Sequence, residues 1–414
     1  MAYPKNRQAA CKNNRLIVQL VFGCISGYVL LKRRGKYLTK LLYLIIVVSF
    51  LDTFIQLPII TPYALDLGAS HLLTGAIVAV YSLSNMIGNI VGGHWIDRFG
   101  RKKMLFTGMI TVSLILLCYP YAQTGEQLFL IRFLHGLFGG VLIPAAFAYV
   151  GDHSKIGSRG KTMALTGGAI GIAAIVGPAL GGAMAAKGQV EYVFWFVAIL
   201  FLICSILIIK FVEESFVSTE KGKFSFSDFM PLLKHPLIIQ ASLAAFALMI
   251  SNGTLAFALP LKVAEMGMSS ATTGIYLSTY GVVALMVFLT PLNRLYDRFS
   301  SIKLVILGIT FIGSVHIMLN FINTYWIIIF LMFIYGIGFA FVFPSMNRIV
   351  AEASTKVDRG KAYGIFYAFF SLGAVVGSFV SGATSEIFGL PFLSSATMML
   401  LVVFILITMA RKRV

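Results

Sequence analysis

Positions 93–103 read Gly93-His94-Trp95-Ile96-Asp97-Arg98-Phe99-Gly100-Arg101-Lys102-Lys103, a short charged turn between two long apolar runs. A degraded copy returns 200 positions later as Arg294-Leu295-Tyr296-Asp297-Arg298-Phe299-Ser300-Ser301-Ile302-Lys303. The same offset pairs Pro144 with Pro344 and Arg159-Gly160-Lys161 with Arg359-Gly360-Lys361. The chain therefore contains two copies of one structural unit.

The composition around the two copies is that of a membrane protein. Hydrophobic residues make up 58% and charged residues 12% of the 414 positions, whereas soluble domains carry about 25% charge. Apolar runs long enough to cross about 30 Å of hydrocarbon lie at roughly 41–64, 72–96, 104–122, 127–150, 162–186, 193–212, 237–260, 271–295, 303–322, 325–349, 361–386 and 392–410. We predict an all-α integral membrane protein with twelve transmembrane helices in two pseudo-symmetric six-helix bundles.

The spacing of these runs divides the chain into four segments. Residues 35–212 and 237–414 form the two bundles, and residues 213–236 form a cytoplasmic linker between them. Residues 1–34 are an N-terminal extension in which a basic head precedes a short apolar run. Three interpretations of this extension remain: a cleaved signal-like segment, an interfacial or thirteenth helix, or a translated segment outside the native core, which we favour.

The net charge of +18 follows the membrane topology. After residue 31, the loops on one side of the predicted membrane hold only Lys187 and Lys262, and Arg132 lies inside a span, while the other 26 Lys and Arg residues fall on the opposite side. Positive charge marks the cytoplasmic side, so both ends of the core are predicted to be cytoplasmic, in a bacterial inner membrane. We expect membrane lipid and no nucleic acid among the partners.

The charged turn has a spacing of glycine, aspartate and arginine that a loop serving only to carry positive charge does not require. Asp97 and Arg101 are four residues apart and can pair if the helix continues through the turn. Gly93, one turn earlier, allows close approach of a neighbouring helix. The recurrence as Asp297-Arg298 favours a conformational latch over a loop that only satisfies the charge rule.

This turn, Gly93-x-x-x-Asp97-Arg98-x-Gly100-Arg101, resembles the signature loop of the major facilitator superfamily. The resemblance extends from about residue 35 to the end of the chain. It implies that the loop residues form a charge relay with an acidic residue at the cytoplasmic end of span 4, the position of Asp152.

Span 5 contains the run Gly177-Pro178-x-x-Gly181-Gly182. Small residues at helical spacing allow tight packing, and the proline removes a backbone hydrogen bond and bends the helix. The run resembles the antiporter motif of the superfamily's drug:proton exporters, although Ala173 stands where that pattern opens with glycine. The second copy has no proline, and this asymmetry favours export.

Two charged residues lie deep within predicted spans. A charged side chain is costly inside a membrane, so each is expected to have a functional or structural role. Arg132 resembles the span 4 arginine that the family ties to proton coupling; the alternative is that its side chain reaches the nearer interface. Asp52 can bind and release a proton as its surroundings change; the alternative is a structural hydrogen bond to a neighbouring backbone or hydroxyl group. His135 can also titrate near neutrality, or it is a packing residue opposite Tyr335.

In this family, spans 1, 4, 7 and 10 line the substrate site between the two halves. Candidates for the substrate cavity on these spans are Phe54, Gln56, Asn252, Tyr335, Phe339 and Phe343. Aromatic side chains with few fixed charges suit lipophilic cations, although most aromatics in a membrane protein pack or face lipid.

The chain lacks the phosphate-binding glycine-rich loop of ATP-driven transporters, a His/Cys/carboxylate metal cluster and a nucleophile elbow. We therefore expect neither an enzyme nor a cofactor or metal. The sequence favours a monomeric, proton-coupled exporter of small lipophilic or cationic compounds, with protons as the second partner. A transporter of one endogenous metabolite, such as a sugar, siderophore or lipid, is the nearer alternative, and a non-transporting membrane sensor the farther one.

Overall fold

The computed structural model describes residues 41–152, 159–187, 189–215, 230–354 and 359–411. The predicted extension 1–34 and most of the predicted linker lie outside this part, as do the side chains of Asp97 and Asp297 and the surroundings of Gly93, whose backbone is helical. All regular elements within the described ranges are helices. The protein has the all-α membrane fold that the apolar runs predict.

The first bundle contains a helix over Leu41–Ile55, α2 (Ile60–Asp66), α3 (His71–Phe99), α4 (Arg101–Leu116), α5 (Gly125–Asp152), α6 (Arg159–Ala185) and α7 (Glu191–Phe211). The second contains α8 (Met230–Leu233), α9 (Pro236–Glu265), α10 (Ser270–Leu289), α11 (Leu295–Arg298), α12 (Ser301–Phe321), α13 (Tyr325–Ala353), α14 (Arg359–Phe388) and α15 (Pro391–Arg411). Ten helices of the described part are long and apolar enough to span a membrane. The bent pair before α3 supplies an eleventh span, and Ala169–Ala185 in α6 is apolar but shorter.

The first predicted span differs from a straight helix. The helix Leu41–Ile55 ends, and α2 starts at Ile60 with an axis bent by 46°. Pro58 lies in the four-residue turn between them, where a missing backbone N–H and the restricted preceding residue interrupt a helix. The bend places Gln56 at a break in the helix, deep in the bundle.

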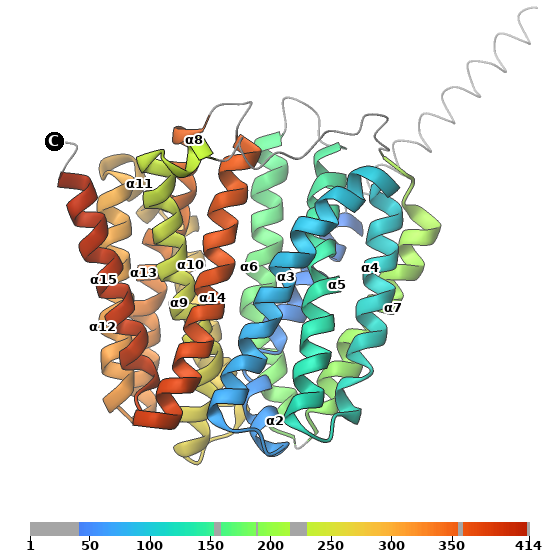
Figure 1. Ribbon diagram of the computed structural model, residues 1–414, viewed down its shortest axis with the longest axis horizontal. Coiled ribbons are helices and arrows are strands. Elements are labelled where there is room, and N and C mark those ends of the chain that lie inside the picture. Colours follow the sequence, from blue (N-terminus) through green and yellow to red (C-terminus); the bar gives the residue numbers. More distant parts are fainter. Residues whose placement is uncertain (1–40, 153–158, 188, 216–229, 355–358, 412–414) are drawn as a thin grey trace, which may run out of the picture.

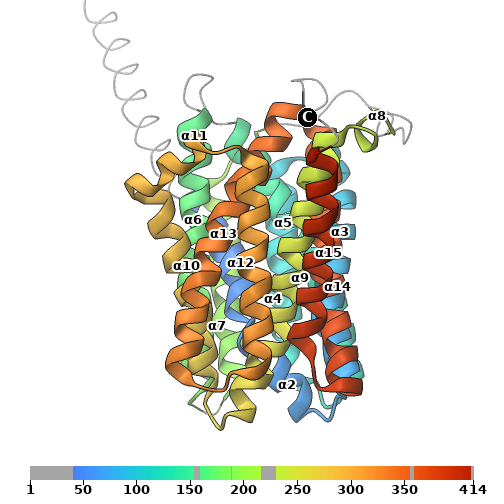
Figure 2. The same ribbon diagram turned by 90° about the vertical axis from the view of Figure 1, so that its left-hand side faces the viewer.

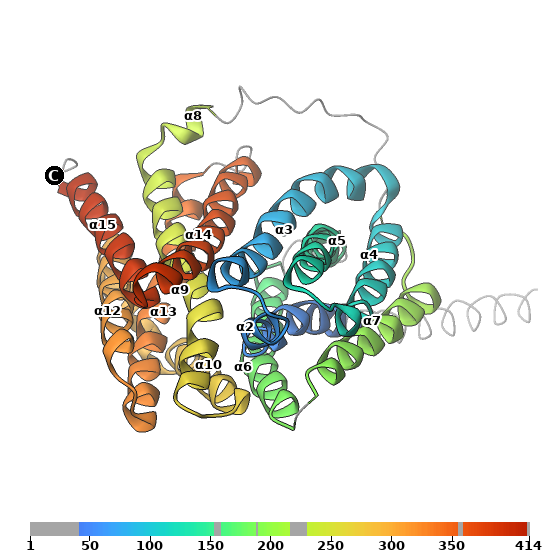
Figure 3. The same ribbon diagram turned by 60° about the horizontal axis from the view of Figure 1, so that its bottom comes forward.

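Each bundle has its own hydrophobic core, one built from residues between Leu41 and Val212 together with Ala256 of α9, and the other from residues between Leu232 and Leu406. The two bundles lie side by side, α2–α7 in blue to green and α9–α15 in yellow to red (Figures 1 and 3). Large apolar side chains such as Leu130, Phe330 and Phe404 remain about 60% exposed. Helices that are apolar on all sides are typical of membrane spans, and we assign these surfaces to lipid contact.

The molecule has two distinct ends. The α3–α4 turn, α8, α11 and the end of α15 lie at one end, which we call the basic end because Arg101, Lys102, Arg298 and Arg411 are there (Figures 1 and 2). The opposite end carries α2, and we call it the α2 end.

The bundles contact each other through α3 against α14 and α6 against α10. Glycines allow these approaches: a Cβ atom built on Gly75 would lie 2.9 Å from the Cα of Gly382. A Cβ atom on Gly182 would clash with the carbonyl oxygen of Ser270, and one on Gly274 with that of Pro178. Gly182 and Pro178 of the span 5 run therefore lie at the junction between bundles.

The two copies of the charged turn are carried by unequal helices. In the first copy, α3 runs unbroken for 29 residues to the turn. In the second copy, α10 ends at Leu289, and Pro291 opens a separate 3-10 segment, Pro291–Arg294, before α11. Proline lacks a backbone N–H and can break a helix, and the second copy reaches its turn through α10, the 3-10 segment and α11 in place of one continuous helix.

Candidate functional site

A cluster of polar side chains is buried within the first bundle. Asp52 and Gln56, from the bent first span, meet Arg132 and His135 from α5. Asp52 is 2% exposed, Arg132 6% and His135 0%. Burying charged groups is costly unless they are paired and hydrogen-bonded, so this cluster requires a set of matched partners.

The carboxylate of Asp52 has a partner on each oxygen. The Nε2 atom of Gln56 donates to its Oδ1 at 2.7 Å, and Nε2 of His135 lies 2.9 Å from its Oδ2. Asp52 is therefore bound by two side chains, an amide and an imidazole. The alternative of a structural hydrogen bond to a backbone or hydroxyl group does not describe these partners.

Arg132 points into the bundle. Its Nη1 donates to Oε1 of Gln56 at 2.8 Å, its Nε lies 3.5 Å from the carbonyl oxygen of Ile77, and its guanidinium carbon is 4.3 Å from the centre of the Tyr81 ring. The structure thus favours the interior position over extension to the interface. The amide of Gln56 stands between the cation and the carboxylate of Asp52 and bonds to both.

Tyr119 completes the cluster and was not predicted from the sequence. Its hydroxyl lies 2.8 Å from Nδ1 of His135, so both ring nitrogens of the histidine are engaged. Tyr119 begins a 3-10 turn, Tyr119–Tyr121, after α4. An aromatic residue at the end of a span is usual at a membrane interface, and nothing in the local spacing distinguishes this one.

The second bundle contains an equivalent cluster without a charge. Ser251 on α9, Tyr335 on α13 and His316 on α12 are buried together. The Oγ atom of Ser251 lies 2.8 Å from the Tyr335 hydroxyl and 2.9 Å from Nε2 of His316. Tyr335 occupies the position 200 residues after His135, and Ser251 lies 199 residues after Asp52.

The predicted cavity residues are spread over different environments. Gln56 belongs to the buried cluster of the first bundle and Tyr335 to that of the second. Phe339 and Phe343 stack on each other along α13, with ring centres 5.5 Å apart. The remaining two differ again: Phe54 stacks on Phe50, and the amide of Asn252 donates to the carbonyl oxygen of Leu248.

At the basic end, the helix does not continue through the charged turn. It ends at Phe99, Gly100 adopts φ of 97°, and α4 begins at Arg101. The condition for that pairing, a helix that continues from Asp97 through Arg101, is therefore not met. Arg101 donates through Nε to Asp152 at 3.0 Å, the acidic residue at the end of span 4.

The turn is completed by Glu214, which the sequence analysis missed. Its carboxylate accepts from the backbone N–H of Arg101 at 2.7 Å and of Lys102 at 3.2 Å, which caps the N-terminus of α4. A carboxylate is favourable at a helix N-terminus. A Cβ atom on Gly100 would clash with this carboxylate, so both the backbone angle and the space require glycine.

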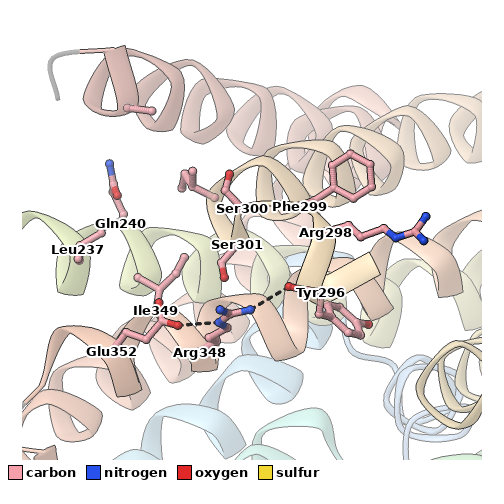
Figure 4. Close-up of a pocket in the computed structure, with 12 residues that line it drawn as sticks. Leu237, Gln240, Tyr296, Arg298, Phe299, Ser300, Ser301, Arg348, Ile349 and Glu352 are labelled. Atoms are coloured by element: carbon pink, nitrogen blue, oxygen red, sulfur yellow. Dashed lines mark hydrogen bonds and ion pairs between the residues drawn. The ribbon is translucent and has the colours of Figure 1, made fainter. Parts of the chain in front are cut away.

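The second copy of the turn has a different arrangement. Arg348 on α13 donates to Glu352 at 2.6 Å and to the carbonyl oxygen of Tyr296 at 2.8 Å (Figure 4). Glu352 lies 200 residues after Asp152, but its guanidinium partner comes from α13 and not from the turn. A cavity of about 540 Å³ adjoins these residues and is also lined by Arg298. Burial raises the pKa of Tyr296 to about 12, so its hydroxyl remains a donor, here to the carbonyl oxygen of Ala340.

The α2 end carries a polar junction between the two bundles. The carboxylate of Glu386, at the end of α14, accepts from the backbone N–H of Leu72 in the first turn of α3 at 2.7 Å. The Oγ atom of Ser385 lies 3.2 Å from Nδ1 of His71. Glu386 thus caps a helix of the opposite bundle, whereas Glu214 caps one of its own.

This junction predicts the behaviour of Glu386→Ala. Loss of the cap removes a favourable contact that exists only while the bundles touch at the α2 end, so we expect the population separated there to rise several-fold. Double electron–electron resonance between spin labels at the exposed positions Asp66 and Phe388 should show a larger long-distance fraction. Glu386→Gln keeps an acceptor and should have a smaller effect. An unchanged distance distribution for Glu386→Ala would show that the cap does not hold the junction.

Comparison with known proteins places this architecture in a family. The model of the Major Facilitator Superfamily matches residues 42–250 and 241–414. The chain is 26% identical over 352 residues to the multidrug resistance protein MdtG of Salmonella paratyphi A, covering 83% of this chain and 85% of that protein. It is 25% identical over 356 residues to the quinolone resistance protein NorA of Staphylococcus aureus, covering 84% and 89%.

Solved structures share the fold at lower identity. A bacterial homologue of the human lysosomal transporter Spinster, solved in an inward-facing and unoccupied conformation, superposes with a TM-score of 0.74 at 16% identity, over 91% of this chain and 96% of that one. The human organic anion transporter MFSD10 superposes with a TM-score of 0.66 at 15% identity, over 90% and 99%.

Proposed function

Because this chain belongs to the major facilitator superfamily, and is thus a multi-pass membrane transporter of small molecules and not an enzyme, we propose that it exports lipophilic or cationic compounds in exchange for protons. The observation that carries this proposal is the buried pair of Asp52 and His135 beside Arg132. The equivalent positions of the second bundle hold Ser251 and Tyr335. Only the first of these two clusters contains a carboxylate and is suited to exchange a proton.

The charges of the cluster support an exchange. With Asp52 ionised, His135 neutral and Arg132 cationic, the cluster has no net charge, and one bound proton makes it cationic. Charge is costly in a buried site, so a proton and a cationic substrate in the adjoining space would disfavour each other. Such mutual exclusion is what an antiporter needs, because each ligand then has to leave before the other binds.

The proposed cycle moves residues 35–212 against residues 237–410. We place the basic end in the cytoplasm of a bacterial inner membrane, since positive loops remain inside, and propose that the transporter acts as a monomer. The α2 end is then the outer end, and its junction keeps the outside closed. Arg101 and Asp152 act as a latch at the inner end, together with Asp97 of the same turn.

Two observations support the proposed substrate class. The relatives named above are a multidrug and a quinolone resistance protein. Aromatic residues on spans 1, 7 and 10, including Phe54, Phe339 and Phe343, offer stacking and cation–π contacts to flat or cationic molecules. A transporter selective for one metabolite has the same fold, and the choice between the two is an outcome of the test below.

The test uses inverted membrane vesicles with an imposed proton gradient, acidic inside. Lipophilic cations and neutral metabolites are added one at a time, and proton release is recorded. We expect several unrelated cations to discharge the gradient in vesicles that contain the protein and not in vesicles that lack it. A response to one metabolite alone would replace multidrug export with specific transport, and a gradient that no tested compound discharges contradicts proton exchange with these substrate classes.

A further inference from the structure

Tyr119, His135 and Asp52 form a continuous row of hydrogen-bonding groups. The Tyr119 hydroxyl lies 2.8 Å from Nδ1 of His135, and Nε2 of His135 lies 2.9 Å from Oδ2 of Asp52. All three are at most 2% exposed. We propose that Tyr119 is a positioning residue that fixes the tautomer of His135, so that the proton is bound by the Asp52–His135 pair and not by Asp52 alone. This inference rests on the proton exchange proposed above.

The donor and acceptor roles in this row select one tautomer. An ionised carboxylate can only accept hydrogen bonds, so Nε2 of His135 carries a hydrogen when Asp52 is ionised. Nδ1 of the neutral ring is then an acceptor, and the Tyr119 hydroxyl donates to it. The opposite tautomer would direct a lone pair at the carboxylate. Tyr119 and Asp52 therefore favour the same state of the ring from its two sides.

The row also defines where an added proton goes. Nδ1 is the unprotonated nitrogen of the neutral ring, so the proton binds there, and the Tyr119 hydroxyl turns from donor to acceptor. The Nε2 hydrogen either stays on the imidazolium or passes to Oδ2 of Asp52. In both cases the pair gains one proton and one positive charge.

The surroundings of His135 contain few other titratable groups. Arg132 lies on the same helix, reaches Asp52 through Gln56 and also interacts with the Tyr119 hydroxyl. From α3, the Tyr81 ring packs edge-on against the His135 ring with centres 5.1 Å apart. On α7, Phe194 faces the row, and the acidic Glu191 lies one turn away from it at the helix start. The titrating pair is thus enclosed by one arginine, one amide and aromatic rings.

The ring of Tyr119 is fixed by its own packing. It stacks on Phe194 with centres 4.3 Å apart and planes 22° apart, and its carbonyl oxygen accepts from the Tyr63 hydroxyl at 2.7 Å. The hydroxyl is therefore presented to His135 from a rigid support, as an orienting group requires.

The second bundle provides an internal comparison. There Ser251 is the central group, bonded to both Tyr335 and His316. A serine hydroxyl can donate and accept, so this cluster does not impose one tautomer on its histidine through a fixed charge. The same three regions of the fold thus form a neutral cluster in one half and an ionisable one in the other.

The experiment compares wild type with Tyr119→Phe, which keeps the aromatic stack and removes the hydroxyl. Nitrogen-15 NMR of histidine-labelled protein, with the His135 signal assigned by its loss in His135→Gln, reports the tautomer directly. We expect one Nε2–H tautomer in wild type and a mixture in Tyr119→Phe. Ser113→Ala removes a buried hydroxyl hydrogen bond of the same length in the same bundle, to the carbonyl oxygen of Ala198, and should leave the tautomer unchanged.

Transport supplies the second readout. In Tyr119→Phe we expect the pH midpoint of gradient-driven transport to move by roughly one unit, the size expected from one hydrogen bond to a buried titrating group, with KM for the cation unchanged. If Tyr119→Phe does not fold, 3-fluorotyrosine at position 119 changes the hydroxyl acidity in a nearly unchanged ring and should alter the same signals. A single wild-type tautomer and an unshifted pH profile in the variant would overturn the inference. If wild type itself shows no proton-driven transport, the proposed function fails while the NMR result still decides the role of Tyr119.

Discussion

Asp52→Asn is expected to abolish proton-driven transport. Asparagine keeps the shape and one acceptor oxygen, which can serve Gln56 or His135 but not both, and it can neither bind a proton nor offset the charge of Arg132. We expect cation-induced proton release to fall at least about 100-fold, equivalent to about 2.7 kcal/mol at 1.36 kcal/mol per tenfold change. The measurement is the initial rate of gradient discharge in inverted vesicles at matched protein levels.

The control for this change is Asp52→Glu. It retains a titratable carboxyl group one methylene farther from the backbone, and we expect partial activity from it. Binding of a labelled cation to purified Asp52→Asn should be weakened, because the cluster then keeps the uncompensated charge of Arg132, as it does when a proton is bound. Undiminished proton release in Asp52→Asn would exclude Asp52 from the coupling path.

Gly182→Val is expected to keep the bundles apart at the α2 end. Even a Cβ atom at this position would clash with the carbonyl oxygen of Ser270, which belongs to the opposite bundle. Overpacking costs about 1–3 kcal/mol, which shifts the population away from the closed α2 end by roughly 5- to 150-fold. Transport should be lost because the cycle cannot return to that state. Spin labels at Asp66 and Phe388 measure the separation.

Gly171→Val is the matched control on the same helix. The nearest atom to a Cβ on Gly171 is Cδ1 of Leu285 at 3.8 Å, an ordinary contact. It should therefore fold and transport nearly normally. Equal transport loss in both variants would point to a general intolerance of branched residues in α6 and would contradict the role assigned to the junction.

The membrane architecture could be predicted from the sequence because it depends on local quantities. Apolar runs of sufficient length fix the spans, and the 200-residue repeat fixes the two bundles. The proximity of Arg132 and His135 also follows from local spacing, since residues three apart lie on one helix face. That Asp52 joins them follows from the cost of leaving a buried charge without a partner.

Other features depend on contacts that no local pattern encodes. Glu214 reaches the start of α4 across 113 positions, and its capping role depends on where α7 ends. Tyr119 meets His135 because of a 3-10 turn whose orientation is set by packing against Phe194. Whether the helix continues from Asp97 to Arg101 was left as a condition in the sequence analysis, and the structure ends the helix at Phe99, where Gly100 adopts a positive φ. The functional roles of all these residues remain predictions for the experiments above.

The unbroken course of α3 gives the first bundle a mechanical property that the second lacks. At about 1.5 Å per residue, its 29 residues form a rod of about 43 Å. One tip of this rod is the backbone N–H that Glu386 caps, and the other is the Gly100 turn beside Arg101 and Asp152. If α3 moves as a rigid body, a tilt at one of its ends moves the other end as well. The corresponding piece of the second bundle is interrupted at Pro291 and would absorb such a tilt. A conformational change at one membrane face should therefore be transmitted to the other face mainly through α3.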